Sequence, residues 1–176
     1  MREVISLDIG PDELLIRGIV HPMFYSNSKG KLKREAFIPP PQKRDVSLLR
    51  RRYCQSDSFC KKHCKSIRVG TSSYCGMAVF LARHVSESND ESINVAASVK
   101  ATPIDEHNNY VDEGLTVYAD SLGLPMHADL LYSVPVPQGV PATLHRVIAD
   151  NLLKLAKYFH DLSPDSDQWE GDSLSV

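Results

Sequence analysis

The segment ATLHRVIADNLLKLAKYFH, residues 142–160, has the clearest periodicity in this 176-residue sequence. Its apolar residues recur at the spacing of one face of an α-helix, namely Leu144, Ile148, Leu152, Leu155 and Phe159. Pro141 suits the first turn of such a helix, and Ser163-Pro164 would end it. The pattern predicts one long amphipathic helix over about residues 142–160, whose apolar face packs on the rest of the domain.

Several segments upstream of this helix are rich in branched apolar residues, which is typical of β-strands. The first is ELLIRGIV at residues 13–20, where Arg17-Gly18 interrupts the apolar run and indicates a bulge or a close backbone approach. Three further segments have the same character: 93–101, 115–122 and 125–136. Together they predict the strands of one sheet.

Three other segments have features of short helices. Residues 56–66 predict a short helix that Ser56 or Ser58 would cap. The run YCGMAVFLARHV at residues 74–85 favours a helix because it is long and dominated by Ala, Met and Leu. The segment DVSLLRRRY at residues 45–53 fits either a strand or one or two helical turns, because its length is too short for periodicity to separate them.

Strands in the first two thirds of the chain, with helices between and after them, predict an α+β domain with a mixed or antiparallel sheet. This single domain covers residues 1–164, and the acidic, serine-rich residues 165–176 are expected to form a mobile tail. The apolar runs are far shorter than the ~20 residues that cross a bilayer. The first residues lack the apolar core of a secretory signal. We therefore expect a cytoplasmic protein that does not enter a membrane.

Charge is distributed unevenly along the chain. Residues 29–68 contain 13 Lys and Arg against three acidic residues, a net charge of +10, whereas the rest of the chain carries −12. This asymmetry indicates an anionic partner, either nucleic acid or an acidic protein, unless the segment is a solvated face or matches the protein's own acidic half. Lys and Arg would neutralise phosphates, and Tyr53 would stack on bases. The predicted binding residues are Lys31, Lys33, Arg34, Arg50, Arg51, Arg52, Tyr53, Lys61, Lys62 and Lys65.

The four cysteines of the chain lie close together in the sequence, at positions 54, 60, 64 and 75. Thiolate and imidazole groups are preferred zinc ligands, and basic neighbours favour thiolates. Cys60 and Cys64 have ligand-like spacing, whereas Cys54 and Cys75 stand apart. One hypothesis is therefore a zinc site built from these cysteines and His63, with zinc as the cofactor. The alternative is four ordinary buried thiols.

Three histidines lie in settings that favour chemistry. His21 ends the first predicted strand, and His107 follows two acidic residues in a predicted loop. His127 and Asp129 alternate, so both would face one side of a strand. A carboxylate beside a histidine can fix its tautomer, so that the ring acts as a general base. These four residues are the catalytic candidates, and hydrogen-bonded structural roles are the alternative.

Common phosphate-binding and hydrolase motifs, such as the P-loop, G-x-G-x-x-G, H-E-x-x-H and G-x-S-x-G, are absent. Three functions stay open. The first is an accessory protein that binds an anionic partner, most testably nucleic acid, through residues 29–68. The second is a small histidine-dependent enzyme acting on a phosphorylated or nucleic-acid substrate. The third is a zinc-stapled interaction module within a larger assembly.

Overall fold

The computed structural model describes residues 1–67 and 69–176. At its centre is a six-stranded sheet in the order β6-β7-β4-β1-β5-β8, in which every neighbouring pair is antiparallel. The strands are β1 Leu14–His21, β4 Asp45–Arg50, β5 Ser73–Leu81, β6 Ala97–Ala101, β7 His127–Tyr132 and β8 Lys157–His160. A separate hairpin consists of β2 Tyr25–Ser26 and β3 Lys31–Leu32. The predicted α+β class is therefore confirmed, with an antiparallel sheet.

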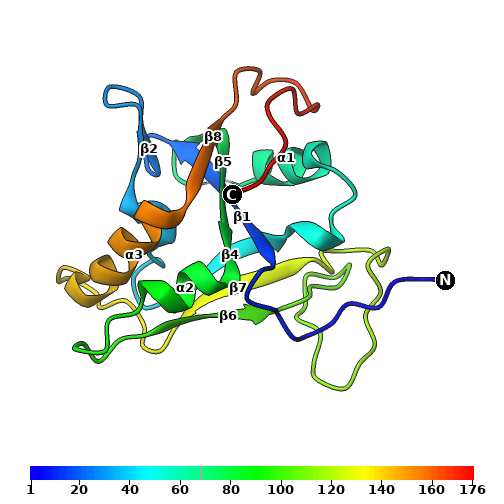
Figure 1. Cartoon of the computed structure of the whole chain (residues 1–176), viewed down its shortest axis with the longest axis horizontal. Helices are drawn as coiled ribbons and strands as arrows, with labels where there is room; N and C mark the ends of the chain where they lie inside the picture. The colour runs from blue at the N-terminus through cyan, green and yellow to red at the C-terminus, as the bar shows by residue number, and fades with distance from the viewer. Residues whose placement is uncertain (68) are drawn as a thin grey trace.

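Helices cover both faces of this sheet (Figure 1). One face carries α1, and the other carries α2 and α3. Leu15, Phe80 and Ile148 contribute to the core beneath α2 and α3, whereas Ile16 and Met77 pack with α1. The helices and 3₁₀ turns are α1 Asp57–Lys65, α2 Ala82–Ser88, α3 Thr143–Leu155, η1 Arg34–Phe37 and η2 Arg51–Tyr53. The middle strands are thus buried on both sides.

Burial on both faces explains why the helix expected over residues 74–85 is wrong. Most of this run is strand β5, and α2 begins only at Ala82. Seven consecutive residues of β5 are buried, so the strand carries no polar face and its sequence shows no alternation. Gly76 fits here because a Cβ atom at this position would lie 2.3 Å from the carbonyl oxygen of Phe159 on the neighbouring strand.

The long C-terminal helix predicted over residues 142–160 is not confirmed, because α3 has 13 residues and ends at Leu155. Ala156 has extended backbone geometry, and the chain turns directly into β8. Ile148 and Leu152 face the core as the helical spacing predicts. Phe159, which continues the same spacing, instead pairs with Met77 of β5 and packs on the α1 side of the sheet.

The remaining sequence expectations have mixed outcomes. Strand 13–20 and helix 56–66 are confirmed as β1 and α1, and the Ser56 hydroxyl caps α1 by accepting a hydrogen bond from the Phe59 amide at 3.1 Å. Segment 45–53 contains both alternatives, β4 followed by η2. Segments 93–101 and 125–136 shorten to β6 and β7. Segment 115–122 is not a strand and forms one isolated bridge, between Tyr118 and Val4.

The acidic C-terminal residues lie against α1. Lys61 of α1 is buried, forms an ion pair with Asp161 at 3.0 Å, and donates hydrogen bonds to the carbonyls of Ser163 and Gln168 at 2.7 and 2.8 Å. Leu174 is buried in the α1-side core. The mobility of residues 165–176 stays a prediction. Within the described part of the chain, no helix has the length and apolar character needed to span a membrane.

Candidate functional site

The candidate site lies where β1 and β4 separate. These strands are paired only through Leu15–Arg50 and Ile16–Leu49 in the described register. Beyond this point the Arg17 side chain fills the gap, donating from Nε to the carbonyl of Ala36 at 3.0 Å and from Nη1 to the carbonyl of Ser47 at 3.3 Å. A charged side chain thus replaces ladder hydrogen bonds between two central strands.

A cavity of about 240 Å³ opens beside Arg17 on the α1 face of the sheet. Its polar lining includes Arg17, His63 of α1 and His127 of β7. Most of the other lining side chains are apolar and come from the sheet, from the residues after α1 and from the loop between β6 and β7: Ile16, Leu48, Leu49, Ile67, Ile104 and Leu124. An apolar cavity with a few convergent polar groups is the usual architecture of a small-molecule site.

His127 contacts Thr102 through Nδ1. Its side chain is 5% exposed, and Nδ1 lies 3.0 Å from the carbonyl oxygen of Thr102 and 2.8 Å from the Thr102 hydroxyl. Because a carbonyl oxygen only accepts, its contact with Nδ1 favours the tautomer that carries the proton on Nδ1. In this tautomer Nε2 carries a lone pair, and it lies 3.8 Å from Oδ1 of Asp129. The predicted placement of His127 and Asp129 on one face of a strand is observed.

Asp129 is a buried carboxylate with an unused oxygen. The residue is 6% exposed, and within residues 1–67 and 69–176 its Oδ1 has no hydrogen-bond partner. Burial, reinforced by the neighbouring Asp45 carboxylate, raises the pKa of Asp129 to about 6, against the opposing effects of the Thr102 hydroxyl and Lys100. Buried polar atoms are nearly always hydrogen-bonded, so an exception of this kind marks a place where a ligand or water belongs.

Asp129 faces a second cavity, of about 580 Å³. Asp45, Lys100 and Tyr110 also line it. The Tyr110 ring lies 6.2 Å from the ring of His127, centroid to centroid. The histidine lines one cavity and the carboxylate lines the other, and their facing atoms, His127 Nε2 and Asp129 Oδ1, lie 3.8 Å apart.

Burial also lowers the pKa values of the two histidines of the site. For His127 desolvation is the largest cause; its hydrogen bond to the Thr102 carbonyl opposes this, and nearby His63 adds to it. The pKa of His63 is lowered by burial as well. Both rings are therefore neutral at pH 7, and His127 Nε2 is available as a proton acceptor.

The other catalytic candidates lie elsewhere. His21 ends β1 and lines a groove beside the β2–β3 hairpin. His107 is exposed in the loop after β6, with Nε2 3.5 Å from a carboxylate oxygen of Glu106. Neither lines either cavity of the His127–Asp129 pair. Of the four residues predicted from the sequence, the structure brings together His127 and Asp129.

Much of the predicted binding set is occupied inside the protein. Arg50 is fully buried and forms a bidentate ion pair with Glu13, with distances of 2.6 and 3.0 Å. Tyr53 is 5% exposed, and its hydroxyl accepts a hydrogen bond from the Ser6 amide. Lys61 is buried against Asp161. These three side chains serve the fold and are not open to a ligand, because charges and rings inside the core cannot reach a surface partner.

Other basic side chains have acidic partners or stay at the surface. Arg51 pairs with Asp57 at 2.8 Å, and Lys65 pairs with Asp167 at 2.9 Å. Lys62 and Arg52 are exposed. The net charge of +10 in segment 29–68 is therefore partly matched by the protein's own acidic residues, one of the alternatives that the sequence leaves open.

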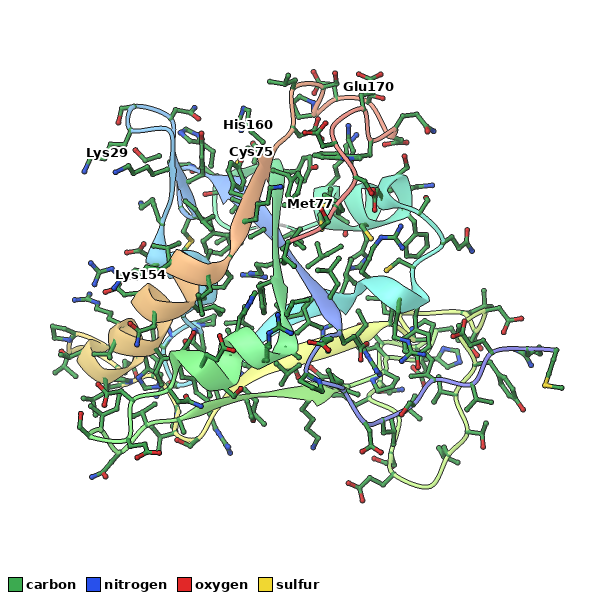
Figure 2. All side chains as sticks on the ribbon, in the orientation of Figure 1. Lys29, Cys75, Met77, Lys154, His160 and Glu170 are labelled. Carbon is green, nitrogen blue, oxygen red and sulfur yellow. The ribbon has the colours of Figure 1, made fainter. Side chains whose placement is uncertain are left out.

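The basic residues around the β2–β3 hairpin form a separate surface group. Lys31, Lys33 and Arg34 line a groove of about 810 Å³, together with Lys29. Figure 2 shows the Lys29 side chain projecting from the tip of the hairpin. Arg34 pairs with Asp150 at 3.3 Å, and Lys33 donates to the carbonyl of Pro22 at 3.3 Å.

The cysteines do not form a metal centre in the described structure. Cys54, Cys60 and Cys64 are buried in the core beneath α1, whereas Cys75, which is labelled in Figure 2, lies on β5 in the opposite core. The Cys75 thiol accepts a hydrogen bond from the Tyr158 hydroxyl. Burial raises the pKa of the Cys64 thiol, which keeps it protonated. Among the described residues, no group of three or more potential ligands could hold a metal ion. The zinc hypothesis, including His63 as a ligand, gains no support.

Sequence reasoning missed Arg17, Thr102 and Tyr110. The signal for Arg17 was present as an arginine within the apolar run ELLIRGIV, but it read as a local interruption of a strand. No protein-family model, curated protein or solved structure matches this chain.

Proposed function

We propose that this protein is a small enzyme that binds a small molecule between β7, α1 and the β6–β7 loop and uses His127 and Asp129 for acid–base catalysis. The observation that carries the proposal is the buried Oδ1 of Asp129, which has no hydrogen-bond partner among the described residues and lies 3.8 Å from His127 Nε2. This separation is too long for a direct hydrogen bond. A hydroxyl group of a substrate, or a water, that contacts both atoms would complete the site.

The two groups suit opposite halves of a proton transfer. His127, neutral and protonated on Nδ1, can accept a proton at Nε2. The imidazolium formed would be stabilised by the adjacent Asp129 carboxylate and by the Thr102 carbonyl. Asp129, with a pKa of about 6, can alternatively deliver a proton near neutral pH. General acids and bases are most effective when their pKa lies near the working pH.

The test uses three chromogenic probes: p-nitrophenyl acetate, p-nitrophenyl phosphate and bis(p-nitrophenyl) phosphate. We expect turnover of at least one probe and its loss in His127→Ala and Asp129→Asn. The matched control is His107→Ala, because His107 also lies beside a carboxylate but is exposed. Turnover that survives His127→Ala would contradict the proposal. Failure to turn over any of the three probes would count against hydrolysis as the reaction.

The hairpin groove favours nucleic-acid binding as a second function. Four basic side chains line this groove, which is wide and open to solvent, in place of the arginine run at 50–52 that the sequence suggests. Lys and Arg at such a surface bind phosphates by releasing counterions. Fluorescence anisotropy with labelled single-stranded DNA, duplex DNA and RNA, from about 50 to 200 mM salt, measures this binding.

Replacing Lys31 and Lys33 together with Ala should weaken nucleic-acid binding and flatten its salt dependence. The control variant replaces Lys43 and Lys62, which are exposed basic residues of the same segment outside the groove. It removes the same charge, so an equal loss of affinity in both variants would indicate a general charge effect and not a hairpin site.

A further inference from the structure

Arg17 differs from the other buried cations of the described chain. Arg50 and Lys61 each form an ion pair with a buried carboxylate, at 2.6 and 3.0 Å. Arg17 is 9% exposed, and within the described residues it forms no ion pair. Its partners are two backbone carbonyls and the ring of Phe24, whose centroid lies 4.8 Å from the guanidinium carbon. Its positive charge is therefore not compensated by a negative one.

The guanidinium keeps this charge at neutral pH. Burial lowers the pKa of Arg17 to about 10, with Cys64 acting weakly in the opposite direction. A buried charge without a counter-charge costs free energy, so proteins seldom keep one unless it is matched. Here Arg17 is one of the residues that line a cavity, where a ligand can supply the match.

The hydrogen bonds of Arg17 involve two of its three guanidinium nitrogens in the described structure. Nε and Nη1 donate to Ala36 and Ser47, whereas Nη2 has no hydrogen-bond partner among the described residues. Guanidinium groups bind carboxylate and phosphate oxygens particularly well, because their N–H groups are planar and fixed in direction. An oxyanion in the cavity would also lie near the rings of His63 and His127, which line the same space.

We propose that the cavity beside Arg17 binds the oxyanion of a small substrate, a carboxylate or a phosphate group, with the Arg17 guanidinium as its counter-charge. The volume of about 240 Å³ limits the ligand to a small molecule, since drug-sized ligands occupy roughly 300–1,000 Å³. The apolar walls fit a short hydrocarbon body. This inference names the substrate class of the proposed enzyme and so rests on the proposed function, but anion binding is measured without catalysis.

The experiment titrates ¹⁵N-labelled full-length protein with sodium phosphate and, separately, with sodium acetate, in a buffer of constant ionic strength. We expect saturable shifts of the amide signals of Gly18, Cys64 and His127 around the cavity. Preference for phosphate would indicate a phosphorylated substrate, and preference for acetate a carboxylic acid. If neither anion shifts these signals, or if the shifts are confined to the hairpin at residues 25–32, the proposal is overturned.

Arg17→Met, which keeps the length of the side chain, should weaken anion binding at least about tenfold, the size expected when a charged hydrogen bond is lost. Arg17→Lys keeps the positive charge but lacks the planar guanidinium group, so its anion affinity should lie between those of the wild type and Arg17→Met. The control Lys43→Ala removes an exposed basic side chain that lines neither this cavity nor the hairpin groove, so it should bind as the wild type does. Equal anion affinity in Arg17→Met would contradict the proposal.

Thermal unfolding keeps the test decisive if Arg17→Met does not fold. A ligand that binds the native state raises its stability, so phosphate or acetate should raise the Tm of the wild type and raise that of Arg17→Lys less. Equal Tm increases in both would overturn the proposal. Asp129→Asn separates the two proposals, because Asp129 does not line this cavity: the variant should lose turnover yet retain anion binding.

Discussion

Arg50 and Arg17 lie on neighbouring strands and are both buried, but they are compensated in different ways. Arg50 is enclosed by the carboxylate of Glu13 and by the backbone carbonyls of Ser6 and Asp8. It therefore fixes the N-terminal segment to the sheet. Arg17 contacts carbonyls and an aromatic ring, and the residue is among those that line a cavity. A completed set of contacts indicates a role in the fold, and an incomplete set indicates room for a ligand.

The same contrast separates the buried carboxylates. Asp161 receives Lys61 and also accepts hydrogen bonds from Tyr74 and the Ser163 amide. Asp129 has one oxygen without a partner in the described structure. Asp129 lies on strand β7, and Asp161 directly follows strand β8. The sequence around each residue is ordinary for such a position, so it does not distinguish the two carboxylates. The distinction depends on which side chains the fold places around each carboxylate.

The largest effect on stability should come from breaking the ion pair between Arg50 and Glu13. Glu13→Gln leaves the Arg50 charge buried without its counter-charge, and such breaks cost about 3–5 kcal/mol. The free energy of unfolding, measured by circular dichroism in urea, should fall by that amount. Asp12→Asn is the control, because its ion pair with Arg83 is largely exposed and should contribute less than about 1 kcal/mol. A loss below about 1 kcal/mol in Glu13→Gln would show that Arg50 does not need its partner.

The second-largest effect on stability should be a gain, opposite in sign to the loss expected for Glu13→Gln. Because burial raises the pKa of Asp129 from 3.8 to about 6, the folded state holds its proton more tightly than the unfolded state. The stability from this group is complete below pH 4 and is lost as the pH rises through 6. Asp129→Asn removes that loss, so it should stabilise the protein at pH 8 by up to about 3 kcal/mol and have little effect at pH 4. Equal effects of the substitution at pH 4 and pH 8 would contradict an elevated pKa.

The pairing of His127 with Asp129 is predictable from the sequence, because alternation along a strand is a local property. The same holds for α1, whose Ser56 cap is next to the residues it caps. The helix expected at 74–85 was wrong because burial on both faces of β5 erases the alternation that identifies a strand. The end of α3 was missed because Phe159 keeps the helical spacing although its backbone pairs with β5.

The roles of the basic residues could not be predicted, because they depend on distant partners. Glu13 lies 37 residues before Arg50, and the carbonyls that hold Lys61 lie more than 100 residues after it. No local pattern marks a charge as buried. The run Arg50-Arg51-Arg52 therefore resembles a binding surface, whereas Arg17 resembles a strand defect. Only the separation of β1 from β4 gives Arg17 its place beside the cavity.

The smallest effect, and the sharpest test of the comparison, is the stability of Arg17→Met in buffer without phosphate or carboxylate. The substitution removes two hydrogen bonds to carbonyls, each contributing about 1 kcal/mol. It also removes an uncompensated buried charge, which offsets that loss. Unfolding in urea should therefore show a change within about 1 kcal/mol, far below that of Glu13→Gln. If Arg17→Met costs as much as Glu13→Gln, both arginines stabilise the fold to the same extent and the open fork of Arg17 has no functional meaning.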